Sequence, residues 1–369
     1  PRSTQGVSSA ASDVYKRQVV GSPDVNVSQG NIANGAYHTA AILSDGSVKV
    51  WGNNDSGQLG QGSTVNIGDG SSEMGDNLSA VDLGTGRTAV RIAAGMSHTA
   101  VILDDGSVKA WGSNTYGQLG QGNSTTLGDG AGEMGDNLSA VDLGAGRTAV
   151  AIAAGDNHTA VILDDGNVKV WGQNTYGQLG QGNTIQIGDG SSEMGDNLSA
   201  VDLGTGRTAV AIAAGGSNTA VILDDGSVKV WGFNNLGQTG QGNTNTIGDD
   251  SNEMGDNLLA VNLGTGKTAI DIAVGQYHTV VILNDSTIKA WGNNSYGQLG
   301  LGNTNTIGDG PAEMGDALQT IGPGLKTLAI AAGASHTIAI LHDGTVVTAG
   351  QNSYGQLGLG STDNMGDDI

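Results

Sequence analysis

The chain has 369 residues, of which 65 are glycine, 4 are proline, 1 is phenylalanine and none is cysteine. This composition favours an all-β fold of short strands and tight turns and excludes disulfides. Its 36 acidic residues outweigh 14 basic ones, and the formal net charge of −22 argues against nucleic-acid and anionic-membrane binding.

The first 18 residues match nothing in the sequence that follows. They lack the apolar core of a signal peptide, so we interpret residues 1–18 as a disordered or non-native leader. Residues 19–369 contain no linker-like stretch, and we predict that they form a single domain. No apolar run reaches the roughly 20 residues of a membrane-spanning helix.

A tryptophan–glycine pair recurs every 60 residues, and its neighbours are copied with it. The tryptophans are Trp51, Trp111, Trp171, Trp231 and Trp291. A shorter sixth copy carries Ala349-Gly350 at this position. A fixed period of this kind indicates one supersecondary unit repeated along the chain, with an atypical terminal unit.

The second copy shows the strands expected in each repeat. Residues 90–94 predict a strand of small residues, and residues 98–103 predict a buried strand. The turn at 104–107 joins that strand to another at 108–111. A long polar loop then leads to a fourth short strand candidate at 140–143. About four strands per repeat is the content of one propeller blade.

The two ends of the chain suggest how a ring of blades closes. The sequence stops at a point that corresponds to the middle of the preceding repeat's loop, so the sixth copy lacks its later strand. Residues 19–35 precede the first His-Thr strand and are able to supply that strand. We therefore predict that one blade contains both terminal segments, which would remove a free sheet edge.

These residues resemble a known repeat. The run Gly95-Met96-Ser97-His98-Thr99, followed by Leu103-Asp104-Asp105-Gly106, Val108, Trp111-Gly112 and Gly117-Gln118-Leu119-Gly120, resembles the regulator of chromosome condensation (RCC1) repeat in its bacterial form. The resemblance covers residues 19–369 and implies an all-β propeller with one blade per repeat. The best-known members have seven blades, whereas six copies predict a six-bladed β-propeller here.

Histidine precedes threonine in five copies, at His38, His98, His158, His278 and His336. Such a ring could hold a metal or transfer protons, but the fourth copy has Asn218, which can replace only the hydrogen bond. We interpret these histidines as structural. The tryptophans fit either a stacking platform or blade packing, and we favour packing. The lysines two residues before them are interpreted as solvated.

An acidic loop recurs in five copies and is the one candidate metal site. Its carboxylates stand on glycine-rich backbone, and calcium prefers several oxygen ligands from such loops. The alternative is that these acids cap turns. The candidate ligands are Asp69, Glu73, Asp76, Asp129, Glu133, Asp136, Asp189, Glu193, Asp196, Asp249, Glu253, Asp256, Asp309, Glu313 and Asp316.

Near-identical copies argue against a catalytic site, because catalytic carboxylates need unlike environments. We therefore predict a non-enzymatic, extracellular or cell-surface bacterial protein that associates with itself into an oligomer or filament, with calcium as its one candidate cofactor. The alternative is a regulatory protein-binding propeller, such as an enzyme inhibitor or a guanine-nucleotide-exchange-like module. The copies differ at Phe233–Leu236, Asp250, Tyr277, Pro311 and Pro323, where an asymmetric site should be sought.

Overall fold

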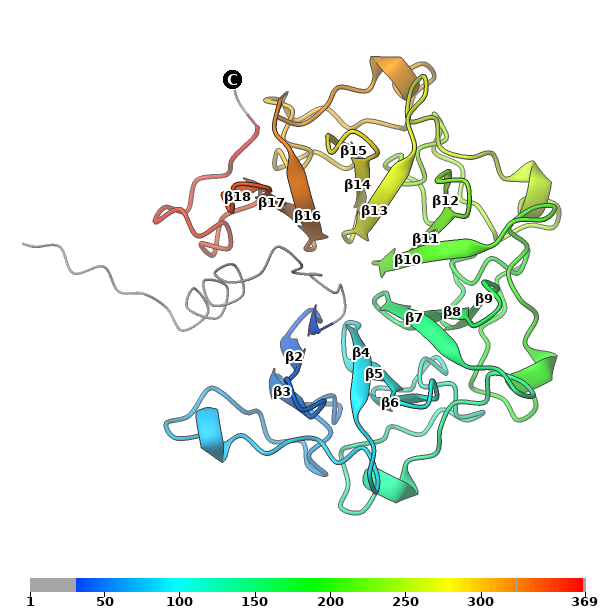
Figure 1. Cartoon of the computed structure of the whole chain (residues 1–369), viewed down its shortest axis with the longest axis vertical. Coiled ribbons are helices and arrows are strands. Elements are labelled where there is room, and N and C mark those ends of the chain that lie inside the picture. Colours follow the sequence, from blue (N-terminus) through cyan, green and yellow to red (C-terminus); the bar gives the residue numbers. More distant parts are fainter. Residues whose placement is uncertain (1–30, 323, 368–369) are drawn as a thin grey trace, which may run out of the picture.

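The computed structural model describes residues 31–322 and 324–367. In these residues the chain forms six three-stranded antiparallel sheets, which stand around a central axis (Figure 1). We number the sheets as blades 1 to 6 in chain order. The all-β class and the one-blade-per-repeat organisation predicted from the sequence are confirmed.

The strand bounds repeat with the sequence. Blade 1 contains β1 (Ile32–Asn34), β2 (His38–Ile42) and β3 (Val48–Gly52), and blade 2 contains β4 (Ala89–Ala94), β5 (His98–Leu103) and β6 (Val108–Gly112). Blade 3 contains β7 (Ala149–Ala154), β8 (His158–Leu163) and β9 (Val168–Gly172), and blade 4 contains β10 (Ala209–Gly215), β11 (Asn218–Leu223) and β12 (Val228–Gly232). Blade 5 contains β13 (Ala269–Val274), β14 (His278–Leu283) and β15 (Ile288–Gly292), and blade 6 contains β16 (Thr327–Ala332), β17 (His336–Leu341) and β18 (Val346–Gly350).

Within a blade the middle strand pairs with both neighbours. In blade 2, Thr99 of β5 lies opposite Trp111 of β6. The predicted turn at 104–107 is present, because the Leu103 amide donates to the Ser107 carbonyl and Asp105 accepts from the Ser107 amide. A long crossover loop, containing a short 3₁₀ helix, then leads to the next blade. These helices are η1 (Gly75–Asn77), η2 (Gly135–Asn137), η3 (Gly195–Asn197), η4 (Gly255–Asn257) and η5 (Gly315–Ala317).

The prediction of a fourth strand at residues 140–143 is wrong. That segment forms no ladder: its backbone makes two isolated hydrogen bonds with other backbone groups, from the Val141 amide to the Val108 carbonyl and from the Gly195 amide to the Asp142 carbonyl. The residue that lies beside the third strand is instead Leu127, which forms an isolated β-bridge with Gly112. The polar, glycine-rich loop on either side cannot extend this bridge, so the blade keeps three strands.

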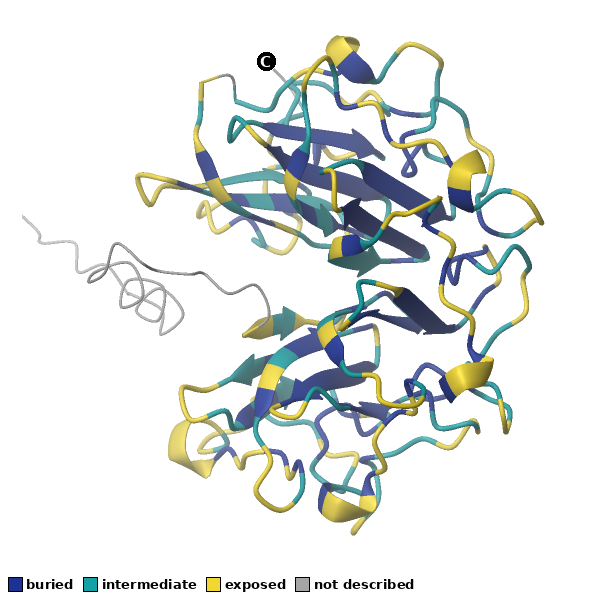
Figure 2. Cartoon of the chain, turned by 45° about the vertical axis from the view of Figure 1, so that its right-hand side comes forward, coloured by how far each residue is buried: buried dark blue, intermediate teal, exposed yellow. Residues whose placement is uncertain are grey.

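The core lies between blades. One cluster joins Val48 and Val50 of blade 1 to Val101, Leu103 and Trp111 of blade 2, and similar clusters follow around the ring. Figure 2 shows the buried residues concentrated in the strands and the exposed residues in the loops and 3₁₀ helices. Each blade therefore stabilises its neighbour by burying apolar surface that a single sheet would expose.

The described residues leave the ring open between blade 6 and blade 1, where the separation is wider than between any consecutive pair (Figure 1). The terminal blades are also less buried: all six residues of β5 and of β8 are buried, whereas β17 alternates between buried and half-buried positions. The closed six-bladed ring predicted from the sequence is therefore not formed by these residues. The prediction that residues 19–35 complete the ring falls mostly outside the described residues, as does the predicted leader. No helix in the described part of the chain is long and apolar enough to cross a membrane.

Candidate functional site

At four of the blade junctions, one backbone carbonyl accepts two hydrogen bonds from the next blade. The Gln58 carbonyl of blade 1 accepts from Trp111 Nε1 at 3.0 Å and from Thr99 Oγ1 at 2.9 Å. The same pair of bonds joins blades 2 to 3, 3 to 4 and 4 to 5. Trp111 is fully buried. The interpretation of the tryptophans as packing residues is therefore confirmed at these four junctions.

Histidines add a further bond at the junctions of blades 1 with 2, 2 with 3, 3 with 4 and 5 with 6. His38 Nε2 lies 2.9 Å from Thr99 Oγ1. Because the Thr99 hydroxyl donates its proton to the Gln58 carbonyl, it must accept one from Nε2 of a neutral histidine. Burial lowers the pKa of His38 to about 4 and that of His98 to about 3. These rings are thus structural donors, which confirms the interpretation made from Asn218.

The fourth copy uses a different bond at this position. Asn218 Nδ2 donates to the carbonyls of Trp231 and Phe233 in its own blade. Thr279 of the next blade still donates to the Gln238 carbonyl. The junction between blades 4 and 5 therefore keeps its tryptophan and threonine bonds and loses the bond from the preceding blade.

The interpretation of the lysines as solvated is wrong for four of them. The Lys109 side chain is buried, and its ammonium donates to the carbonyls of Leu83 and Gly135. Lys169, Lys229 and Lys289 repeat these contacts. Desolvation lowers the pKa of Lys109, while the nearby carboxylates of Asp136 and Asp82 oppose this shift. Each of these lysines joins two successive crossover loops.

The acidic loop residues have separate structural tasks. Glu133 Oε2 accepts from the amides of Gly128 and Gly130, both at 2.8 Å, and so caps its own turn. Asp136 accepts from the amide and the hydroxyl of Thr85 in the preceding crossover loop. The equivalent glutamates make the same bonds. Asp256 and Asp316 repeat both bonds of Asp136, whereas Asp196 accepts from the Ala145 amide alone.

The first aspartate of each acidic loop makes different contacts from the second aspartate of that loop. Asp189 accepts a hydrogen bond from Gln186, and its backbone lies against Gly117 of the preceding blade. Asp309 differs, since burial and the neighbouring Glu313 carboxylate raise its pKa. Among the described residues no group of three or more His, Cys, Asp or Glu side chains is arranged to hold a metal ion. The structure gives the calcium prediction no geometric support, and it stays a prediction.

The two ends of the strands form two different faces of the ring. We call the end with the hairpin turns the turn face, which is represented in blade 2 by residues 103–107. A basic residue of the preceding crossover loop binds this turn: Arg87 pairs with Asp105 at 2.6 Å, and Arg207 pairs with Asp225 at 2.8 Å. Lys267 pairs with Asp285 in the same way. In blades 2 to 5 the turn face thus repeats one ion-paired pattern.

We call the opposite end the loop face, which in blade 1 consists of residues 35–37 and 53–57 and in later blades of their equivalents. Here the copies differ most. The residue after the first-strand glycine is Ala36, Met96, Asp156, Gly216, Gln276 or Ala334. Several exposed tyrosines also lie on this face, namely Tyr37, Tyr176, Tyr296 and Tyr354. The repeated backbone is therefore kept while the side chains that it presents change.

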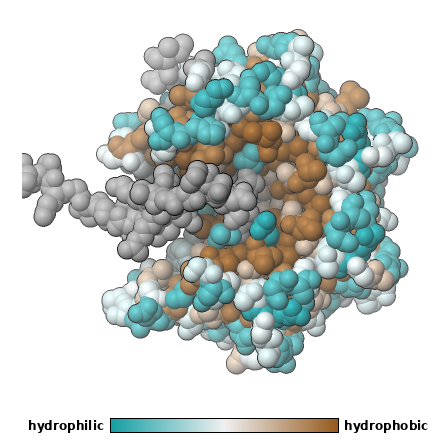
Figure 3. Space-filling view, viewed as in Figure 1, coloured by the Kyte–Doolittle hydropathy of each residue, from teal (hydrophilic) through white to brown (hydrophobic). Residues whose placement is uncertain are grey.

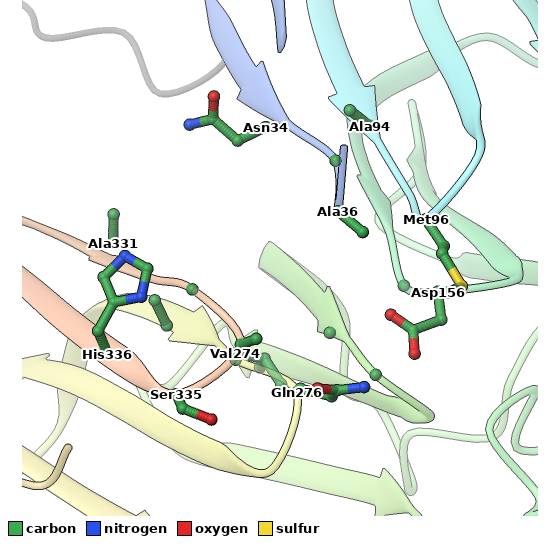
Figure 4. Close-up of a pocket in the computed structure, with 18 of the residues that line it drawn as sticks. Asn34, Ala36, Ala94, Met96, Asp156, Val274, Gln276, Ala331, Ser335 and His336 are labelled. Carbon is green, nitrogen blue, oxygen red and sulfur yellow. The ribbon is translucent and has the colours of Figure 1, made fainter. Parts of the chain in front are cut away.

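The loop face surrounds an axial hollow of about 660 Å³. Ala94, Ala154 and Ala214 line it from the ends of the first strands, and apolar residues gather around it in Figure 3. Figure 4 shows Met96, Asp156 and Gln276 in this lining, where loops from blades 2, 3 and 5 approach the axis. We take the hollow and the loop face around it as the candidate functional site.

Sequence reasoning missed Asp156, Met96 and Gln276. A usable signal was present, because this one position changes in nearly every copy while its glycine and His-Thr neighbours are almost constant. Of the departures noted from the sequence, Phe233 and Tyr277 lie on the loop face, and the Phe233 ring is 4.6 Å from the Tyr176 ring. Asp250 and Pro311 lie in the crossover loops, and Pro323 falls outside the described residues.

Comparison with known proteins identifies the family to which these repeats are similar. A family model described as the regulator of chromosome condensation (RCC1) repeat matches residues 31–58, 89–118, 149–178, 209–238, 269–298 and 328–356. A second model of that description matches residues 105–162 and 290–340. The chain is 30% identical over 339 residues to the ultraviolet-B receptor UVR8 of Arabidopsis thaliana, covering 89% of this chain and 67% of the receptor.

One further sequence relative and two solved structures are also similar to this chain. The chain is 27% identical over 358 residues to the regulator of chromosome condensation of Drosophila melanogaster, covering 95% of this chain and 59% of that protein. The crystal structure of Prp20p from Saccharomyces cerevisiae superposes with a TM-score of 0.70 at 20% identity, over 91% of this chain and 75% of that one. Human WBSCR16 superposes with a TM-score of 0.66 at 22% identity, over 90% of this chain and 80% of that one.

These two solved structures share the fold of this chain. The matched segments coincide with the strands and junction residues of all six blades described above. The chain therefore belongs to the regulator of chromosome condensation (RCC1) repeat family.

Proposed function

We propose that this chain is a non-enzymatic protein-binding propeller whose contact surface is the loop face. The observation that carries the proposal is the contrast between the two faces. Side chains vary among otherwise similar repeats on the loop face, whereas the turn face repeats one ion-paired pattern. A scaffold that keeps its backbone and varies its exposed loops is typical of binding proteins.

The side chains of the loop face suit a protein partner. Tyr354 is 91% exposed and Tyr37 is 64% exposed, and tyrosine is enriched in the residues that dominate the affinity of protein interfaces. The apolar lining of the axial hollow adds a recess into which a partner side chain can enter. A net charge of −22 favours a basic partner over an acidic one.

Relatives support this type of function. One crystal structure contains Kap60 bound to the yeast RCC1 protein Prp20, and another study of Prp20p concerns its binding to Gsp1p and histones. Those partners belong to those proteins. For this chain, we propose only the general class of protein partner.

The non-enzymatic part of the proposal rests on how the polar side chains are used. The histidines of blades 1, 2, 3 and 5 donate to threonines inside the junctions, and the acidic loop residues cap turns or join loops. Secretion, filament formation and calcium bridging, which formed the main prediction from the sequence, stay predictions. The family match favours the alternative of a protein-binding propeller.

The test compares two sets of substitutions in the full chain. The loop-face variant replaces Tyr37, Tyr176, Tyr296 and Tyr354 with serine, and the turn-face variant replaces Arg87, Arg147 and Arg207 with glutamine. Affinity purification from cells that make the protein, followed by quantitative mass spectrometry, should recover a stoichiometric partner with the wild type and the turn-face variant but not with the loop-face variant. A partner that depends on the turn face, or that is retained equally by all three proteins, would contradict the proposal.

A further inference from the structure

We propose that the axial hollow binds a slender organic cation, the ammonium or guanidinium group of a lysine or arginine side chain on a partner protein, with Asp156 as its counter-ion. This inference rests on the proposed function for the source of the cation. The preference of the hollow itself is a separate property, which can be tested without a partner.

The first step is the environment of Asp156. The hollow has a volume of about 660 Å³, which lies within the usual range of roughly 300–1,000 Å³ for ligand pockets. Its walls are mostly alanine and glycine, with Met96 beside Asp156 (Figure 4). Among the described residues that line the hollow, Asp156 is the one acidic residue and none is lysine or arginine.

The second step is the bonding of the carboxylate. No ion pair among the described residues includes Asp156. Figure 4 shows the Gln276 side chain near the Asp156 carboxylate. Burial raises the pKa of the Asp156 carboxyl, and the neighbouring Gln276 side chain opposes that shift. A bound cation would offset the cost of holding the negative charge in this partly apolar space.

The third step is that the fold does not need this carboxylate. The equivalent positions carry alanine, methionine, glycine and glutamine. The junction uses the backbone here: the Met96 amide donates to the Asp156 carbonyl, and the Asp156 amide donates to the Gly216 carbonyl. The side chain is therefore free for a role that is specific to this blade.

The chemistry of the site selects the kind of cation. One carboxylate and one amide supply too few oxygens for calcium, which takes about six to eight oxygen ligands. An alkylammonium or guanidinium group needs one carboxylate, and its aliphatic stem can lie along apolar walls. The walls contributed by Ala94, Ala154 and Met96 match such a stem.

The test uses the methyl group of Met96 as a local reporter. We would label the full chain with ¹³C-methyl methionine, assign the Met96 signal with Met96→Leu, and titrate N-acetyl-arginine methylamide in buffer of physiological ionic strength. N-acetyl-citrulline methylamide is the matched neutral probe, since it keeps the shape and lacks the charge. The controls are Asp156→Asn, which removes the proposed counter-ion, and Asp250→Asn, which removes one charge from an exposed crossover loop.

We expect the arginine probe to shift the Met96 signal saturably in the wild type and in Asp250→Asn. Asp156→Asn should weaken its binding at least tenfold, and the citrulline probe should cause no saturable shift. Equal shifts with both probes, or an Asp156→Asn variant that binds like the wild type, would overturn the proposal. Equal weakening by Asp250→Asn would assign the effect to general surface charge and would also overturn it.

The outcomes for the hollow and for the proposed function can be separated. A protein partner that requires the loop-face tyrosines but is indifferent to Asp156→Asn supports the proposed function and contradicts the cation site. Specific binding of the arginine probe without a stoichiometric protein partner on the wild type supports the cation site and contradicts the proposed function.

Discussion

Two regions of the ring can be compared: the junction between blades 2 and 3, and the opening between blades 6 and 1. Equivalent residues lie at both places, but their burial and hydrogen bonds differ. Trp171 is fully buried and donates to the Gln118 carbonyl, whereas Trp51 in blade 1 is only partly buried. Thr159 donates to that carbonyl too, while Thr39 donates to Asn34 of its own blade. The residue type therefore determines which hydrogen bonds and packing contacts a junction can make. Whether these contacts are made depends on the neighbouring blade.

The same contrast holds for the glycine-rich loop after each third strand. A Cβ atom added to Gly120 would lie 2.8 Å from Trp171 Nε1, but one added to Gly358 would meet no described atom within 4 Å. Both glycines have positive φ, of 66° and 70°. Matched substitutions at interior and opening positions therefore separate the effect of the neighbouring blade from local effects.

The largest difference is expected for tryptophan. Trp171→Ala should lower the free energy of unfolding by about 3–5 kcal/mol, since it removes a fully buried ring and leaves a cavity. Trp51→Ala should cost less than half of that amount because its ring is only partly buried. Urea unfolding monitored by circular dichroism measures both values. Equal losses would contradict the open ends described above.

Glycine substitutions should give the next largest difference. Gly120→Ala combines a positive φ with a clash against the Trp171 ring, and we expect a loss of more than about 2 kcal/mol. Gly358→Ala has the backbone cost alone, on the order of 1 kcal/mol. The same urea experiment applies, and a loss for Gly358→Ala as large as that for Gly120→Ala would indicate that another blade covers this loop.

The buried lysines provide a third pair. Lys169→Met should cost about 2–3 kcal/mol, because the carbonyls of Leu143 and Gly195 lose a charged donor. Lys49 is more exposed, and among the described residues it donates to the Gly75 carbonyl alone, so Lys49→Met should cost about 1 kcal/mol or less. Thermal unfolding followed by calorimetry ranks the two variants. A neutral Lys169→Met would show that this lysine is dispensable for joining the loops.

The histidines predict a loss of stability that develops only as the pH is lowered. Burial lowers the pKa of His158 to about 4, so the unfolded state binds more protons than the folded state as the pH falls below about 6.5. Stability is therefore complete above that pH and is lost between about pH 6.5 and 4, by about 1.4 kcal/mol per pH unit for each such histidine. Unfolding measured at several pH values tests this slope.

Matched asparagine variants sharpen the pH prediction. His158→Asn should reduce the slope by nearly one proton, as the natural Asn218 shows that the fold accepts this residue. His336 in blade 6 is less buried, and burial lowers its pKa as well, so His336→Asn should reduce the slope by less. Identical slopes for the wild type and His158→Asn would contradict the assignment of buried neutral rings.

Much of a single blade was predictable from sequence. Alternation, the turn at 104–107 and the position of Trp111 specified the hairpin, and Asn218 identified the histidines as hydrogen-bond donors. The burial of Lys109 was not predictable, because its acceptors are carbonyls 26 residues away in both directions. The false fourth strand at 140–143 arose because a short apolar stretch in a crossover loop resembles a strand.

The open ring and the axial site depend on tertiary geometry. The angle between blades follows from junction bonds such as Trp111 to Gln58, and the sequence gives no measure of that angle. Asp156 and Gln276 are 120 positions apart in the sequence and meet only because the blades turn about one axis. Their variability among near-identical repeats was a usable signal that sequence reasoning missed, and it carries no information about location.

The opening between blades 6 and 1 can be measured directly, because the absence of native cysteine permits two clean spin-label pairs. One pair, Ser56→Cys with Tyr354→Cys, spans the opening on the loop face. The other, Tyr116→Cys with Tyr176→Cys, occupies equivalent positions on the consecutive blades 2 and 3. Double electron–electron resonance should give a clearly longer distance for the first pair than for the second. Equal distances would mean that blade 6 closes on blade 1 as other blades close on their neighbours, and would contradict this account.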